Sequence, residues 1–209
     1  MHETRIKICG ITSPDDARAC ADLGVDYLGI IFANGERRVT KAAALAIREA
    51  VPAAMLVGVF ADAPIAHVAD IAATCRLNMI QLHGRETPEY CDELSSRVSL
   101  PIIKALQPGE EFDVAKLVQY RRTSYFLFDL GKNSSGLGDD VLERLWSQAA
   151  VMRDKGFRIF LAGSLTVGNV RAAVQRVRPY AVDVARGVEL SPGVKNPHTV
   201  AQFIREVTH

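Results

Sequence analysis

Eight short apolar runs alternate with eight longer amphipathic stretches along this chain of 209 residues. The apolar runs are nearly continuous, which is typical of parallel strands covered on both faces. We predict strands at 5–11, 27–32, 54–60, 78–84, 101–107, 125–130, 158–164 and 181–187, and helices at 14–24, 40–50, 64–75, 87–97, 113–121, 139–155, 166–177 and 197–207. Strand–helix repeats in this number indicate one α/β domain over 1–209, a closed (β/α)8 or TIM barrel.

An open, doubly wound sheet is the alternative architecture. It is disfavoured by the count of eight units and by the lack of a Gly-x-Gly-x-x-Gly sequence after the first strand. Start signals support the helix assignments, because Ser13-Pro14-Asp15 and Thr87-Pro88-Glu89 each place a proline just inside a helix start. The chain contains neither a linker nor a low-complexity tract that would indicate a second domain.

Charge and cysteine content exclude several classes of protein. The formal net charge is +1 with acids and bases interspersed, so we expect neither nucleic acid nor an anionic membrane as a partner. Apolar runs fall short of the roughly 20 residues of a membrane span, and no signal peptide is expected. The four cysteines lack Cys-x-x-Cys or zinc-like spacing, which predicts free thiols, no bound metal and a cytoplasmic location: Cys9, Cys20, Cys75 and Cys91.

Two strand ends carry candidate proton-transfer groups, because α/β barrels mount catalytic side chains at the carboxyl ends of their strands. Cys9 closes the first strand and is either a general base or nucleophile, or a small core residue. Asp129 follows the apolar run 125–128, so partial desolvation should raise its pKa and suit it to donating a proton. A helix cap or a salt-bridged rim residue is the other interpretation of Asp129.

Other polar residues near strand ends are candidates for binding a substrate. Gln81 and His83 share one face of the fourth strand, and His83 is either a second acid–base group or a polar rim residue. Asp183 is the rival acid, although its mid-strand position favours a buried structural carboxylate. We place all three among the residues expected to contact substrate.

The turns after the seventh and eighth strands predict a phosphate site. Gly163-Ser164 and Arg186-Gly187 stand where barrels that bind phosphorylated ligands hold the phosphate, and glycine lets the backbone approach closely. Residues 188–195 have room for the short extra helix of such sites. Arg37 and Arg38 follow the second strand, where an arginine could clamp a substrate carboxylate or simply be solvated.

The loop 130–139 is longer than most connections in such a fold and is rich in Gly, Ser and Asn. At the rim of a barrel it is a candidate lid over the active site, with Gly136 contacting substrate. The alternative is a surface loop without function.

Several of these motifs together resemble the phosphoribosylanthranilate isomerase family, from one end of the chain to the other. The resemblance is carried by Lys7-Ile8-Cys9-Gly10-Ile11-Thr12, Gln81-Leu82-His83-Gly84, Ile103-Lys104-Ala105 and the tail 178–195. It implies the Amadori rearrangement of N-(5-phosphoribosyl)anthranilate to 1-(2-carboxyphenylamino)-1-deoxyribulose 5-phosphate in tryptophan biosynthesis, without cofactor or metal. It also implies a small phosphorylated substrate as the partner, and a chain that works as a monomer or a homodimer.

The resemblance assigns roles to residues of this chain. Cys9 is then the general base and Asp129 the general acid, while Arg37 binds the anthranilate carboxylate. The turns at 163–164 and 186–187 correspond to the family's phosphate cradle.

This chain departs from the family pattern within the implied site. Glu36 stands beside Arg37 where the family commonly has Ser-Pro-Arg, and Arg186 replaces a serine of Ser-Ser-Gly. Gly163-Ser164 replaces Gly-Gly, and the lid lacks the usual lysine and aromatic pair. These changes leave open the same chemistry on a modified N-glycosyl amine. They also leave open a phosphate-binding lyase or epimerase with Lys104 as a Schiff-base lysine, and a non-catalytic binding protein.

Overall fold

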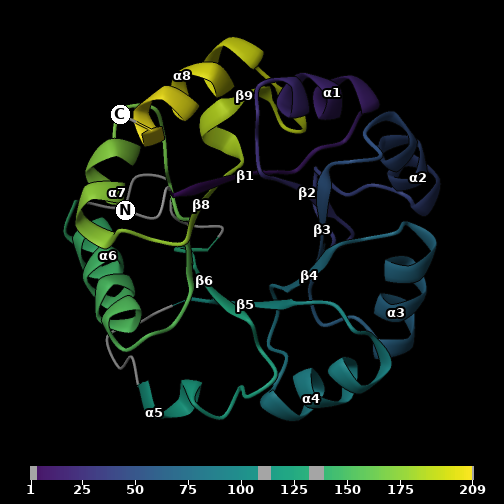
Figure 1. The fold of residues 1–209 in the computed structure, drawn as a ribbon, viewed down its shortest axis with the longest axis horizontal. Helices are drawn as coiled ribbons and strands as arrows, with labels where there is room; N and C mark the ends of the chain where they lie inside the picture. The colour runs from purple at the N-terminus through teal and green to yellow at the C-terminus, as the bar shows by residue number, and fades with distance from the viewer. Residues whose placement is uncertain (1–3, 108–113, 132–138, 209) are drawn as a thin grey trace.

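The computed structural model describes residues 4–107, 114–131 and 139–208. Eight parallel strands pair in sequence order, and the last closes onto the first, so the predicted closed barrel is confirmed. Figure 1 shows the ring of strands from one end of the barrel. The strands are β1 (Arg5–Cys9), β2 (Tyr27–Ile31), β3 (Met55–Phe60), β4 (Met79–Leu82), β5 (Ile102–Leu106), β6 (Tyr125–Phe128), β7 (Ile159–Leu161) and β8 (Ala181–Val184).

Helices surround this ring on its outer side (Figure 1). They are α1 (Pro14–Asp22), α2 (Lys41–Ala50), α3 (Ile65–Thr74), α4 (Pro88–Arg97), α5 (Val114–Leu117), α6 (Asp139–Asp154), α7 (Val170–Val177) and α8 (Pro197–Thr208). Side-chain caps fix several of their starts: the hydroxyls of Ser13, Thr40 and Thr87 each accept a hydrogen bond from a backbone N–H in the first turn.

Several predicted elements end or begin elsewhere; the helix predicted at 113–121, for example, ends at Leu117. The helix predicted at 166–177 begins only at Val170. The Asn169 side chain accepts a hydrogen bond from the Thr166 N–H and donates one to the Ser164 carbonyl, which holds residues 164–169 in a turn. The short helix predicted within 188–195 was wrong in position. A 3-10 helix, η1 (Arg186–Val188), comes directly after β8, and an antiparallel hairpin of β9 (Glu189–Ser191) and β10 (Val194–Lys195) follows it.

Alternation along each strand divides the core into two layers. Side chains of one set, such as Tyr27, Leu127 and Phe160, fill the inside of the barrel. The other set, such as Ile8, Leu28 and Phe126, packs outward against the helices. This alternation places Lys7 and Cys9 on the inner face of β1, while Ile6 and Ile8 face outward.

Tyrosines close the amino end of the barrel. Arg5 donates hydrogen bonds to the hydroxyls of Tyr27 and Tyr180, and the hydroxyl of Tyr125 donates to that of Tyr180. Arg158 lies over the rings of Tyr125 and Tyr180. The amino end of the barrel is therefore closed by packed side chains, which is the end that contributes stability rather than catalysis in such barrels.

All four cysteines are buried with free thiols. Within the residues that the structure describes, none of the helices combines the length and apolar character needed to cross a membrane. The same residues contain no cluster of three or more His, Cys, Asp or Glu side chains that could hold a metal ion.

Candidate active site

A cavity of about 1160 Å³ opens at the carboxyl ends of the strands. All but one of the residues predicted for the site line it: Cys9, Arg37, Gln81, His83, Asp129, Gly163, Ser164, Asp183, Arg186 and Gly187. The exception is Gly136, which lies with most of the proposed lid outside the described residues. Residues from all eight strand ends, with Gln107 contributed by the end of β5, thus meet in one cavity.

Cys9 is the last residue of β1 and is 8% exposed. Its register partner on β2 is Gly29, where a Cβ would lie 2.7 Å from the Cys9 sulfur and 3.1 Å from Nζ of Lys7. Only glycine therefore leaves space for both groups. Burial raises the pKa of the Cys9 thiol, although the ammonium groups of Lys7 and Lys195 act in the opposite direction.

A buried ion pair lies beside this thiol. Lys7 Nζ is 2.8 Å from Oδ2 of Asp183, and both side chains are almost fully buried. Burial alone would lower the pKa of Lys7, but the Asp183 carboxylate and the Cys9 thiol raise it above its ordinary value. Asp183 thus has an ionic partner within the barrel while it also lines the cavity. Its Oδ1 is buried without a hydrogen-bond partner among the described residues.

Asp129 closes a chain of three polar side chains. The amide nitrogen of Gln81 lies 2.9 Å from Nδ1 of His83, and Nε2 of His83 lies 3.2 Å from Oδ2 of Asp129. If the Gln81 amide donates to Nδ1, then His83 carries its proton on Nε2 and donates it to Asp129. Gln81 on β4 and His83 directly after it therefore orient the carboxylate.

The expectation of a raised Asp129 pKa was wrong. Burial does raise it, but the hydrogen bond from His83, the electrostatic effect of its ring and the backbone N–H groups of Gly131 and Leu130 outweigh burial. The pKa of Asp129 therefore lies below its ordinary value of 3.8. In the protein without ligand, Asp129 is a carboxylate at neutral pH.

Of the two adjacent arginines, Arg37 turns toward the cavity and Arg38 does not. Arg38 is exposed and donates to the Asn34 side chain. Arg37 is bound to Glu189: its Nε lies 2.8 Å from Oε1 and its Nη2 lies 2.5 Å from Oε2. Residue types near strand two gave no sign of this partner, which comes from the hairpin after β8.

Lys195 is a further residue that the sequence reasoning missed. It is 2% exposed, and its Nζ donates to the Cys9 carbonyl at 2.6 Å and to Oε1 of Glu189 at 2.7 Å. The only signal in the sequence was its place at the end of the motif 188–195.

The predicted phosphate-binding turns lie together at the cavity wall. Ser164 has a left-handed φ of +54° directly after Gly163, and Gly187 lies against the carbonyl of Leu165 from the turn after β7. The two turns are therefore in contact, with η1 beginning at Arg186.

Lys104 is placed away from this chemistry. Its Nζ lies 2.9 Å from the buried Glu86 carboxylate and donates to the carbonyls of Gly84 and Leu82. It is absent from the described lining of the cavity. An amine held in this way is a structural cation that supports the loop after β4, so it does not fit a Schiff-base role.

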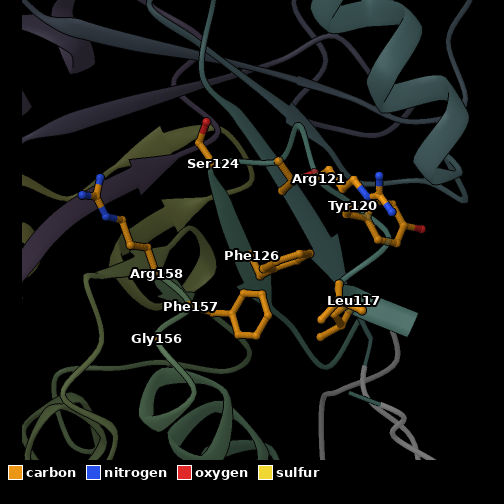
Figure 2. A pocket seen from close by; sticks show the side chains of 10 residues that line it. Leu117, Tyr120, Arg121, Ser124, Phe126, Gly156, Phe157 and Arg158 are labelled. Carbon is orange, nitrogen blue, oxygen red and sulfur yellow. The ribbon is translucent and has the colours of Figure 1, made fainter. Parts of the chain in front are cut away.

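A second cavity, of about 530 Å³, lies on the outer side of the sheet between α5 and the start of β7. Figure 2 shows Phe126 and Phe157 facing each other there, with Tyr120 and Arg121 at one side. Its described lining includes no carboxylate, thiol or imidazole. Thiol, carboxylate and imidazole side chains instead line the cavity at the strand ends.

The fold and this cavity define a class: an α/β barrel with an acid–base site at its mouth, where a thiol, a carboxylate and arginines suited to an anionic ligand lie together. Residues 6–206 match the family model of N-(5'-phosphoribosyl)anthranilate isomerase. The chain therefore belongs to the N-(5'-phosphoribosyl)anthranilate isomerase family.

Individual relatives agree along nearly the whole chain. The N-(5'-phosphoribosyl)anthranilate isomerase of Moorella thermoacetica is 42% identical over 207 residues, covering 97% of this chain and 89% of the relative. The crystal structure of the Thermotoga maritima enzyme matches with a TM-score of 0.87 at 33% identity and 98% coverage of both chains. Another family structure, solved with reduced 1-(o-carboxyphenylamino)-1-deoxyribulose 5-phosphate, matches with a TM-score of 0.84 at 33% identity, again covering 98% of each chain.

Proposed function

We propose that this protein converts N-(5-phosphoribosyl)anthranilate to 1-(2-carboxyphenylamino)-1-deoxyribulose 5-phosphate, an isomerase step of tryptophan biosynthesis. The observation that carries the proposal is the family match over residues 6–206, together with Cys9 and Asp129 in one cavity. The partner is this small phosphorylated molecule, and we expect a cytoplasmic monomer or homodimer.

The reaction needs two proton transfers. A general acid protonates the furanose ring oxygen, so that the C1′–O bond breaks and a Schiff base forms between C1′ and the anthranilate nitrogen. A general base then removes the proton from C2′, and the resulting enolamine tautomerises to the ketose. We assign the acid to Asp129 and the base to Cys9, and the steps use no metal or cofactor.

The resting protonation states are the reverse of those that the two steps require. Asp129, with its lowered pKa, holds no proton at neutral pH, while Cys9, with its raised pKa, holds one. One proton must therefore pass from the thiol to the carboxylate, directly or through solvent. Bound substrate favours protonation of Asp129, because the substrate's phosphate and carboxylate anions raise the pKa of a nearby carboxyl group. Lys7 favours it at Cys9, because its cation stabilises the thiolate.

Binding groups surround this pair. We assign the substrate carboxylate to Arg37 and the phosphate to Gly163, Ser164, Arg186 and Gly187, where glycine backbone and an arginine offer donors to an anion. Gln81, His83 and Asp183 are assigned to substrate binding around the ribose, and Gly136 remains an expectation from the sequence.

A coupled assay tests the function. N-(5-phosphoribosyl)anthranilate is generated from anthranilate and phosphoribosyl pyrophosphate with the transferase, this protein is added, and the loss of substrate fluorescence is followed. The expected result is a loss that is fast relative to a mixture without this protein. Absence of any acceleration by the folded protein would move the search to another N-glycosyl amine.

A further inference from the structure

Arg37, the residue assigned to the substrate carboxylate, is held by a carboxylate of the protein itself. Glu189 on β9 accepts hydrogen bonds from both Nε and Nη2 of Arg37. The Glu189 side chain is 4% exposed, so this is a nearly buried, two-point contact. The arginine side chain also lies over Gly10, where a Cβ would come within 2.7 Å of Cδ of Arg37. Arg37 therefore has one defined position before any substrate arrives.

A carboxylate on the guanidinium would by itself cancel the charge that attracts an anionic substrate. Lys195 restores that charge, since its Nζ lies 2.7 Å from Oε1 of Glu189. The cluster of Arg37, Glu189 and Lys195 contains two cations and one anion, which gives a formal charge of +1. The substrate carboxylate thus meets an oriented guanidinium within a cluster that is still positive.

The same lysine connects this cluster to the proposed base. Lys195 Nζ donates to the backbone carbonyl of Cys9 at 2.6 Å, and its backbone N–H donates to Asp16 at the start of α1. Gly193, at the hairpin turn, also donates its N–H to Glu189 and accepts from the Thr12 hydroxyl. The β9–β10 hairpin is therefore fixed both to the end of β1 and to Arg37.

We propose that Glu189 and Lys195 are positioning residues, which hold Arg37 in the orientation that receives the substrate carboxylate and keep the cluster positive. This inference rests on the proposed function, in which Arg37 binds that carboxylate. Holding the guanidinium before binding removes the cost of ordering a long, flexible side chain when the substrate arrives.

The test compares two stable ligands by calorimetry. One is reduced 1-(o-carboxyphenylamino)-1-deoxyribulose 5-phosphate, and the other is the same compound made from aniline, which lacks the carboxylate. The ratio of their dissociation constants is the carboxylate selectivity. We expect a selectivity of at least about tenfold for the unmodified protein and its loss in Arg37→Ala.

Glu189→Gln should reduce the selectivity by about tenfold while the dissociation constant of the aniline ligand changes by less than about threefold. Glu189→Asp is the second variant, because it keeps the negative charge beside Lys195 and so protects the fold, yet withdraws the carboxylate from Arg37. It should also lose selectivity. Circular dichroism verifies that each variant is folded.

Glu36→Gln is the matched control. It removes the same charge from the residue next to Arg37, but Glu36 is exposed and is not a partner in the hydrogen bonds that hold the guanidinium. Its selectivity should not fall.

Two results would overturn the inference: unchanged selectivity in the Glu189 variants, or an equal weakening of both ligands, which is the sign of a merely structural role. In either case, loss of selectivity in Arg37→Ala would leave the proposed function standing. A lack of selectivity in the unmodified protein would instead contradict the assignment of Arg37 itself, and the inference with it.

Discussion

Lys7 and Asp183 are register partners on the adjacent strands β1 and β8, and their side chains form an ion pair of 2.8 Å inside the barrel. The same face of β1 presents Cys9 two residues later. The pair thus supplies a fixed cation next to the thiol, and its neutralising anion comes from the opposite end of the chain. A buried pair of this kind costs much when one partner is lost, because the other is left as an uncompensated charge.

Asp183→Asn should therefore destabilise the protein by about 3–5 kcal/mol, measured as the free energy of unfolding in urea. Glu206→Gln is the control, since it removes one partner of an exposed ion pair with Arg171 and should cost less than about 1 kcal/mol. Similar losses in the two variants would mean that the interior pair contributes no more than a surface one.

The acid sensitivity of the fold follows from Asp129 and Glu189. Burial raises the pKa of each carboxyl group, but hydrogen bonds outweigh it. The hydrogen bond from His83 holds the pKa of Asp129 below its ordinary 3.8, and those from Arg37 and Lys195 hold the pKa of Glu189 below its ordinary 4.5. A carboxyl group with a lowered folded-state pKa stabilises the fold fully above its unfolded pKa and loses that contribution as pH falls through the folded one. The free energy of unfolding should accordingly fall as pH drops below about 4.5.

Urea unfolding between pH 7 and pH 3 tests this, with Glu189→Gln for comparison. The variant lacks one of the two titrating groups, so its stability should depend less on pH across the acid range. Parallel curves for the two proteins would contradict a lowered pKa at Glu189.

His83→Ala should raise the pKa of Asp129, because it removes the hydrogen bond and the electrostatic effect of the imidazole that lower it, while burial remains. If Asp129 must hold a proton to open the ring, its carboxyl group in the variant keeps that proton to a higher pH. The limb of the pH–rate profile that reports loss of this proton should then move upward in pH. His67→Ala, on the exposed face of α3, is the control and should leave the profile in place.

Arg186→Ala should raise KM for the phosphorylated substrate more than it lowers kcat, because it removes binding common to the ground and transition states. A charged hydrogen bond is worth about 1.5–3 kcal/mol, so we expect a rise of about tenfold or more. Arg121→Ala, in the second cavity, serves as the control. An unaltered KM in Arg186→Ala would remove this residue from the phosphate site.

The barrel was predictable because a strand's alternation and a helix's periodicity are local properties. The eight strands were located correctly, and Gln81 and His83, assigned to one face of the fourth strand, both line the cavity. The predicted strands ran long mainly at their carboxyl ends, where β8 ends at Val184 and the chain turns into η1.

The interactions that tune the site were not predictable, since they join distant parts of the chain. An apolar run before Asp129 indicates burial, but it does not reveal that His83, 46 residues earlier, lies against the carboxylate. Glu189 meets Arg37 across 152 residues, and Lys195 reaches the Cys9 carbonyl across 186. Only the closure of the barrel brings these groups together.

The central claim is that Cys9 and Asp129 perform the two proton transfers of the isomerisation. The most direct measurement is the rate of N-(5-phosphoribosyl)anthranilate fluorescence loss for the unmodified protein, Cys9→Ala and Asp129→Asn side by side, with circular dichroism confirming the fold of each. We predict rapid loss for the unmodified protein and a decrease in kcat of about 10²–10⁴-fold in each variant. Turnover by folded Cys9→Ala at the rate of the unmodified protein would contradict the account.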